Sequence, residues 1–212
     1  MGKYEQRPWD ELNEFLPDGA AEKVLQLLHH YKVHLTVTRA RKSILGDYRN
    51  AVNGKNHRIT VNGNLNRYSF LITLIHELAH LLTYEQYGHR VLAHGSEWKA
   101  CYRHLLQDFL ATNIFPQDIR NELVNSSRNP AASTCAEEGL TRILKRYDPK
   151  IPGVFLVEQL PVDSLFTTKD GRVFKKGERL RKRFRCIAMD NGATYLFSPL
   201  YEVKILQQKP EL

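Results

Sequence analysis

The spacing of apolar residues predicts a first helix near the start of the chain. Val24, Leu25 and Leu28 fall on one side of a helix that covers residues 17–32. Asp18 stands where a side-chain oxygen would cap the first turn. We therefore expect an amphipathic helix here.

Short runs in which apolar and polar residues partly alternate follow this helix. They cover residues 32–39, 42–49 and 57–62, and a turn-forming Asn-Gly-Lys-Asn sequence separates the last two. Alternation with a period of two is typical of half-buried strands. We expect these runs to form a three-stranded antiparallel meander.

Two longer helices are predicted next. The first spans about residues 67–86 and begins at Asn64 or Asn66. The second lies within residues 93–113 and places five apolar side chains on one side: Trp98, Cys101, Leu105, Leu106 and Phe109.

A polar break at residues 125–134 then interrupts the pattern, and beyond Ile151 short strand-like runs alternate with turns. Between them, Thr134 and Glu137 form a capping-box pattern for a short helix that ends near Tyr147. The chain is thus predicted to be α+β, in three parts: residues 1–125 as the main domain, 126–150 as a linker with a short helix, and 151–212 as a small basic β-rich module.

The helix at residues 67–86 carries a group of titratable residues. His76 and His80 are one turn apart, and Glu77 follows the first of them, in the His-Glu-x-x-His spacing. On a helical wheel the three share the side opposite the leucines and isoleucines. In this motif two imidazoles bind zinc and the glutamate is the general base. An amphipathic helix that displays these side chains to solvent has the same pattern.

A catalytic zinc needs a third protein ligand and an open fourth position. His94 is the best candidate, because it stands at the start of the next predicted helix, followed by the permissive Gly95. His89, Glu97 and His104 are the alternatives.

The composition of the chain bears on its cellular location. No apolar run approaches the ~20 residues that cross a bilayer, so we expect no membrane partner. The three cysteines include no CxxC pair, which argues against a disulfide framework and against a cysteine zinc ribbon. The first residues lack the apolar core of a signal peptide. We therefore expect a cytoplasmic protein.

Part of the formal charge of +8 is concentrated near the C-terminus: residues 169–185 hold nine Lys and Arg against two acids. Basic residues interleaved with aromatic ones are typical of a nucleic-acid surface, whereas a solvated strand face over a small core is the alternative. Alternation places Arg181, Arg183 and Arg185 opposite Phe184 and Cys186. The predicted nucleic-acid-binding residues are Lys175, Lys176, Arg179, Arg181, Lys182, Arg183 and Arg185.

Four segments, at residues 37–49, 57–62, 74–82 and 94–99, together resemble the SprT-like metallopeptidases, whose eukaryotic relatives include Spartan. The resemblance runs from about Glu22 to Phe115. It implies a zincin-like domain with a short antiparallel sheet and a motif-bearing helix. It also implies one zinc ion held by His76, His80 and His94, and Glu77 as base.

The chain departs from the family in its C-terminal part. Bacterial members resemble this domain followed by a four-cysteine zinc ribbon, whereas here only Cys186 of such a set is present. We therefore expect no second, structural zinc.

These observations predict a zinc-dependent metalloendopeptidase that acts on protein substrates. Spartan-type relatives act on proteins attached to DNA, which makes DNA a candidate partner. One alternative is a nucleic-acid-binding protein with a structural or catalytically weak zinc site, and another is a zinc hydrolase that acts on a non-peptide bond.

Overall fold

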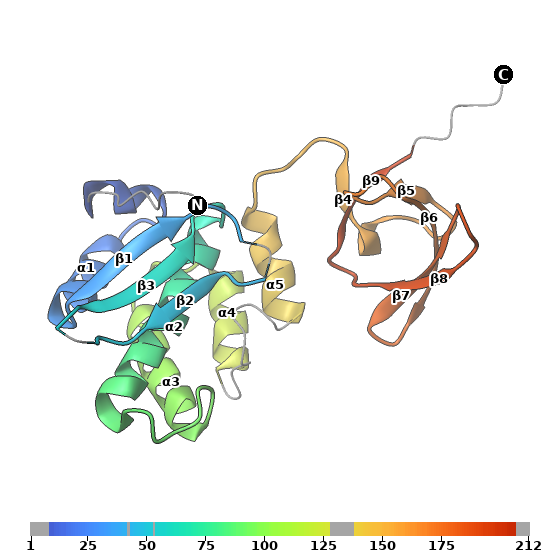
Figure 1. Ribbon diagram of the computed structural model, residues 1–212. Coiled ribbons are helices and arrows are strands. Elements are labelled where there is room, and N and C mark those ends of the chain that lie inside the picture. The colour runs from blue at the N-terminus through green and yellow to red at the C-terminus, as the bar shows by residue number, and fades with distance from the viewer. Residues whose placement is uncertain (1–8, 42, 53, 128–137, 207–212) are drawn as a thin grey trace. The chain divides into compact units, whose positions relative to one another are not determined.

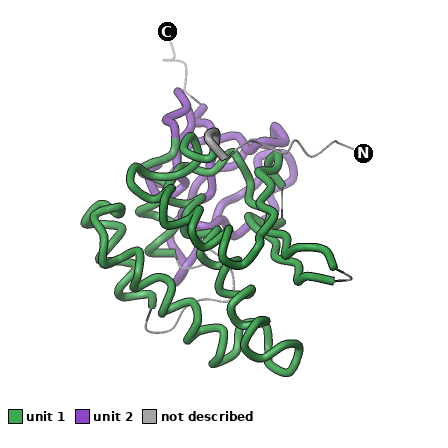
Figure 2. Tube along the Cα trace, turned by 90° about the vertical axis from the view of Figure 1, so that its left-hand side faces the viewer, with its two compact units in different colours: residues 1–148 green, residues 149–212 purple. Residues whose placement is uncertain are grey.

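The computed structural model describes residues 9–41, 43–52, 54–127 and 138–206. The chain divides into two units, unit 1 (Met1–Asp148) and unit 2 (Pro149–Leu212), which Figure 2 colours separately. Each unit has its own hydrophobic core. The described part of the chain is α+β, with five α-helices, three short 3-10 helices and two sheets.

The sheet of unit 1 consists of β1 (Val33–Thr38), β2 (Gly46–Arg49) and β3 (His57–Asn62), in the order β1-β3-β2. β1 runs parallel to β3, and β2 runs antiparallel to it (Figure 1). The three strands lie where the sequence predicts them, but the antiparallel meander is wrong, because β3 is central.

The connection between β1 and β2 explains this topology. Arg41, in that connection, donates from Nε to Asn62 Oδ1 at 2.7 Å and from Nη1 to Thr60 Oγ1 at 3.0 Å. Both acceptors belong to β3, so the chain is fixed across that strand before β2 begins. Ile59 and Val61 of β3 are fully buried, as expected of a central strand.

The helix that carries the histidine motif lies at the centre of unit 1. This helix, α2 (Arg67–Tyr87), contacts β2 and β3 on one side and α3 (Ser96–Leu110) on another. Every residue from Ser69 to Thr83 except His80 is buried. The motif therefore does not lie on a solvent-facing side of an amphipathic helix. The other helices of unit 1 are η1 (Trp9–Glu14), α1 (Ala21–His30), α4 (Gln117–Ser126), α5 (Glu138–Leu144) and η2 (Lys145–Tyr147).

The sequence-predicted helices agree with these elements, with two differences. All five apolar residues predicted to line one side of α3 are buried. The sequence did not predict α4, in which only Ile119 and Leu123 are buried, too few to set a clear period. In α5, part of the predicted linker, Leu140 and Leu144 join the core of unit 1. The predicted capping box precedes α5 and lies outside the described residues.

Unit 2 is a six-stranded antiparallel sheet in the order β4-β9-β5-β6-β7-β8. In Figure 1 its strands curve around a common interior, which Phe166, Phe174, Cys186 and Val203 help to fill. Its elements are β4 (Val154–Leu156), η3 (Val157–Gln159), β5 (Leu165–Thr167), β6 (Val173–Leu180), β7 (Arg183–Ala188), β8 (Thr194–Phe197) and β9 (Glu202–Ile205). Among the helices that the structure describes, none has the length and apolar content needed to cross a membrane.

Of the two asparagines predicted to open α2, Asn66 is the cap. Its Oδ1 accepts the backbone N–H of Ser69 at 2.9 Å. Its Nδ2 donates to the carbonyl of Leu144 at 3.0 Å and to Asp148 Oδ1 at 2.6 Å. One side chain thus holds the start of the central helix and the end of unit 1 together.

We predict that Asn66→Ala lowers the free energy of unfolding by about 1–2 kcal/mol or more, because it removes a cap and leaves two acceptors without their donor. The free energy of unfolding of Asn66→Ser, which keeps a cap acceptor, should lie between that of the parent and that of Asn66→Ala. Asn64 is exposed, so Asn64→Ala serves as the matched control and should change little. Denaturant unfolding measures all three variants, and equal losses in Asn64→Ala and Asn66→Ala would contradict the assignment.

Candidate metal centre and basic surface

Three histidines from two parts of unit 1 meet at one point. His76 and His80 lie one turn apart on α2, and His94 comes from the segment just before α3. The Nε2 atom of His76 lies 3.3 Å from that of His80 and 3.3 Å from that of His94. One ring nitrogen from each residue lies within 4.8 Å of the other two. The group could hold a metal ion.

The spacing of these nitrogens fits a tetrahedral metal. Two nitrogens that are each about 2.0–2.1 Å from a tetrahedral zinc lie about 3.3 Å apart. Hydrogen bonding among the rings is a poorer explanation, because a neutral imidazole has one N–H and the Nε2 of His76 faces two other nitrogens. A shared cation would give all three nitrogens a partner.

The protonation state of the histidines favours the same role. Burial, followed by the charges of His80 and His94, lowers the pKa of His76 to about 3. Burial and the charge of His94 lower the pKa of His80 to about 4, and burial also lowers the pKa of His94. Neutral imidazole is the form that binds metals, so the site stays ready for a cation at neutral pH.

Trp98 lies against all three histidines. Its ring centroid is 4.7 Å from that of His76, 5.3 Å from that of His80 and 4.8 Å from that of His94, and it stacks on Tyr102 at 5.2 Å. Sequence analysis placed Trp98 only in the core. Its position one turn after His94 was the signal that links it to the site. Its Nε1 is the one buried side-chain nitrogen or oxygen that lacks a hydrogen-bond partner in the described part of the chain.

Glu77 is buried beside the histidines, with 6% of its surface exposed. Burial, and secondly the charge of Asp47, raises the pKa of its carboxyl to about 8, while Arg41 acts in the opposite direction. A dication at the three histidines would favour the ionised carboxylate. Glu77 is not among the three clustered ligands, which leaves its carboxylate available for proton transfer.

The strand β2 passes directly over this carboxylate. A Cβ atom on Gly46 would lie 2.5 Å from Glu77 Oε1 and 2.8 Å from Thr73 Cγ2. Any larger residue at position 46 would force Glu77 or Thr73 to move. Glycine is needed here because of this close contact and not because of its backbone φ angle. Sequence analysis did not single out Gly46, because the contact joins residues that are far apart in the chain.

A buried histidine holds the far end of β2 against α2. The Nδ1 atom of His57 accepts a hydrogen bond from the backbone N–H of Ala51 at 3.2 Å and lies 2.9 Å from the hydroxyl oxygen of Tyr48. The other ring nitrogen, Nε2, lies 3.3 Å from Glu85 Oε1. This chain of contacts ties the strand above Glu77 to the helix that carries it.

The alternative third ligands lie outside the cluster. His89 is exposed and packs edge-on to Tyr84, with 5.1 Å between ring centroids. Glu97 accepts a hydrogen bond from Ser96, and His104 is exposed on α3. The structure thus brings together the ring nitrogens of His76, His80 and His94, and none of these alternatives joins them.

The predicted basic residues of unit 2 do not all share one surface. Arg183 and Arg185 are exposed on β7, whereas Phe184 and Cys186 between them are buried, as alternation predicts. Arg181 lies in the turn before β7 with a φ of 49°. Arg179 and Lys182 are also exposed.

Lys176, unlike these exposed residues, is buried. It is 3% exposed, its Nζ donates to the carbonyl of Leu160 and it lies 4.2 Å from the centroid of the Phe184 ring. The physical reason is alternation along β6, which turns Lys176 to the same side as the buried Phe174. Its placement on a nucleic-acid surface is therefore corrected.

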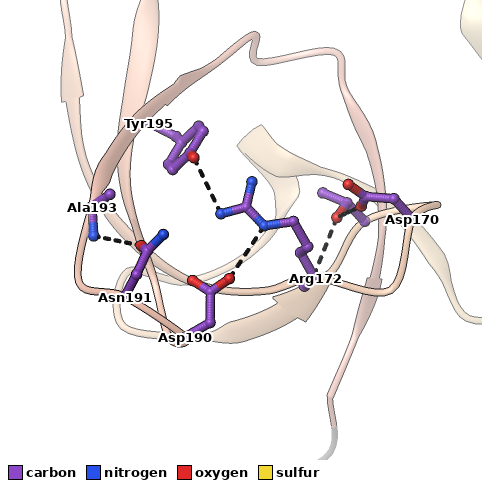
Figure 3. A network of polar contacts seen from close by, with 7 residues as sticks. Asp170, Arg172, Asp190, Asn191, Ala193 and Tyr195 are labelled. Atoms are coloured by element: carbon purple, nitrogen blue, oxygen red, sulfur yellow. Dashed lines mark hydrogen bonds and ion pairs between the residues drawn. The ribbon is translucent and has the colours of Figure 1, made fainter.

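Several other cations of unit 2 are held by acids. Arg172 donates to the hydroxyl of Tyr195 and lies 3.5 Å from Asp190, as Figure 3 shows. Lys175 pairs with Asp163 at 2.9 Å, and Lys169 lies near Glu202. The side chains of Arg181, Lys182, Arg183 and Arg185 have no ion pair within the described residues.

Comparison with known proteins gives one match. A family model described as the SprT-like family matches residues 10–117, which include the sheet of unit 1, α1 to α3, the three histidines and Glu77. No curated protein and no solved structure matches the chain.

We predict that Gly46→Ala lowers the free energy of unfolding by about 1–3 kcal/mol, because the added methyl group overlaps Glu77 and Thr73. In a Glu77→Ala background the same change should lower the free energy of unfolding clearly less, because Glu77 Oε1, the atom nearest to the added methyl group, is absent. Denaturant unfolding of the four proteins gives the coupling energy. Additive effects would show that β2 does not press on Glu77.

Proposed function

The chain belongs to the SprT-like family, and from this premise we propose that it is a zinc-dependent metallopeptidase that hydrolyses peptide bonds in protein substrates. The family match supports a metallopeptidase-like role. The observation that carries the finer proposal is the group of three buried or half-buried imidazoles with one buried carboxylate beside it.

In this proposal His76, His80 and His94 would hold the zinc ion, as three protein ligands do in catalytic zinc sites. Zinc, when bound, acts as a Lewis acid that activates water and polarises the scissile carbonyl. Trp98 packs on all three rings and restricts their orientation. Such outer contacts keep ligands in place and influence how tightly the metal binds.

Glu77 is the proposed general base. In its ionised form it takes a proton from the attacking water, and it can return that proton to the nitrogen of the departing amine. Its position under Gly46 keeps the carboxylate away from bulk solvent. The presence of this carboxylate argues against a purely structural metal site, which needs no base.

Nucleic acid, and DNA in particular, is the proposed partner of unit 2. Arg181, Lys182, Arg183 and Arg185 are exposed and form no ion pair among the described residues, so they are free to contact phosphates. The exposed Arg179 completes this basic surface.

A pocket of about 360 Å³ beside the basic surface supports this partner. Tyr195, Phe197, Tyr201 and Arg183 contribute to its lining, and Tyr195 and Tyr201 are 38% and 40% exposed. The guanidinium carbon of Arg172 also lies 4.7 Å from the centroid of the Tyr195 ring. Exposed aromatic rings next to cations are suited to stack nucleobases whose phosphates the cations hold.

We predict that Glu77→Gln keeps the fold and one zinc per chain but lowers the rate of protein cleavage by about 10²–10⁴-fold, because the amide cannot accept the proton. His94→Ala is the contrasting variant and should lose zinc. Elemental analysis and a cleavage assay, with and without DNA, measure both properties. Full zinc in His94→Ala would remove His94 from the site, and unchanged cleavage by Glu77→Gln would remove Glu77 as base.

We predict that the affinity of the parent protein for duplex DNA falls with salt, with a slope near −0.9 in log–log form for each phosphate contact, and without sequence preference. Changing Arg181, Arg183 and Arg185 to Glu should weaken binding and flatten that slope. The control changes the exposed Lys55, Arg90 and Arg103 of unit 1 to Glu, which alters the net charge equally. Equal effects of the two triple variants would contradict a local binding surface.

A further inference from the structure

The outer face of the sheet in unit 1 carries a charged pocket that the proposed peptidase does not use. Alternation along β3 turns Ile59 and Val61 into the core, and it turns Arg58 and Thr60 to the opposite side. The pocket on that side has a volume of about 280 Å³. Its lining comes from all three strands and the β1–β2 connection: His34, Thr36, Arg41, Asp47, Arg49, Arg58 and Thr60.

Cationic and imidazole side chains form a row across the sheet in this pocket. Arg58 on the central strand is paired in register with His34 on one side and with Arg49 on the other. Directly opposed like charges destabilise a sheet. Arg49 and Arg58 are exposed, so packing does not require guanidinium groups at these positions. A local arrangement that opposes stability is a sign of a functional site.

One guanidinium of the pocket is fixed in place before any ligand arrives. Arg41 donates to Asn62 at 2.7 Å, to Thr60 at 3.0 Å and to the carbonyl of Leu45 at 3.4 Å. These acceptors are neutral, so the charge of Arg41 is not cancelled by them. A preorganised cation loses less conformational entropy when it binds an anion.

The charges of the pocket do not balance. The lining has three arginines and a single acid, Asp47, which accepts a hydrogen bond from Arg49 at 3.0 Å. Three positive charges less one negative charge leave +2, carried mainly by Arg41 and Arg58. A carboxylate or a phosphodiester would neutralise half of this charge, whereas a phosphate dianion would neutralise all of it.

We propose that this pocket is a phosphate-binding site, specific for the dianion of inorganic phosphate or of a phosphate monoester. Guanidinium groups match the oxygens of phosphate in fork-like pairs, and the hydroxyls of Thr36 and Thr60 add neutral donors. The site belongs to the face of the sheet opposite α2. None of its lining residues belongs to the histidine cluster, so its test does not depend on the proposed peptidase activity.

The test is calorimetric titration of the full chain with inorganic phosphate at about pH 8, above its second pKa, and at constant ionic strength. The parent should bind one phosphate per chain. Arg58→Gln should weaken binding about tenfold or more, because it removes a charge-assisted hydrogen bond. Arg103→Gln, an exposed arginine on α3, is the matched control and should leave affinity unchanged.

Thermal unfolding gives a second measurement that does not depend on activity. Without phosphate, Arg58→Gln should be at least as stable as the parent, since the repulsion with Arg49 is relieved. Phosphate should raise the Tm of the parent and not that of Arg58→Gln. No saturable binding to the parent, or the same affinity in Arg58→Gln and Arg103→Gln, would overturn the proposal.

Competition separates the sources of the phosphate group. Phosphoserine should displace inorganic phosphate from the parent, which supports a monoester site. An oligothymidylate without terminal phosphate should not do so. Displacement by this oligonucleotide alone would overturn the dianion assignment and turn the face into part of a nucleic-acid surface.

Discussion

The burial of α2 is the constraint on which the rest of unit 1 depends. A helix covered on both sides must satisfy or neutralise every polar group that it carries. Its threonines do so locally: Thr73 and Thr83 donate to carbonyls four residues earlier, at 2.8 Å and 2.7 Å. His76 and Glu77 have no such local solution. Burial instead lowers the pKa of His76 and raises that of Glu77, so both side chains favour their neutral forms. The neighbouring elements supply the contacts that these two side chains lack within the helix.

Three neighbouring elements meet the requirement that α2 creates. The segment before α3 brings in His94, which completes a donor set for one cation, and α3 supplies Trp98 as a packing surface for the rings. β2 brings a backbone without a side chain, at Gly46, over the carboxylate of Glu77. The carboxylate of Glu77 is not among the three clustered donors, which could hold a metal ion.

The two faces of the mixed sheet differ in their chemistry. The inner face is apolar and packs on α2, while the outer face carries arginines from β2, β3 and the β1–β2 connection. Unit 2 separates inside from outside in the same way: alternation along β7 buries Phe184 and exposes Arg183 and Arg185. In β6 it buries the amine of Lys176, which then depends on a carbonyl and an aromatic ring. Which face a basic residue occupies, more than the number of basic residues, decides what it can bind.

The sequence by itself determined the features that are local. Helical period and capping chemistry located α2 and α3, and the motif spacing placed His76, Glu77 and His80 together, because residues one turn apart share a side. Tertiary structure alone decided the strand order, the approach of Gly46 and the row of Arg49 and Arg58. These features depend on pairing between strands that are distant in the chain, and a short alternating run has no information about which neighbour it will join. The same limit explains α4, whose two buried residues became part of the core only through packing against α5.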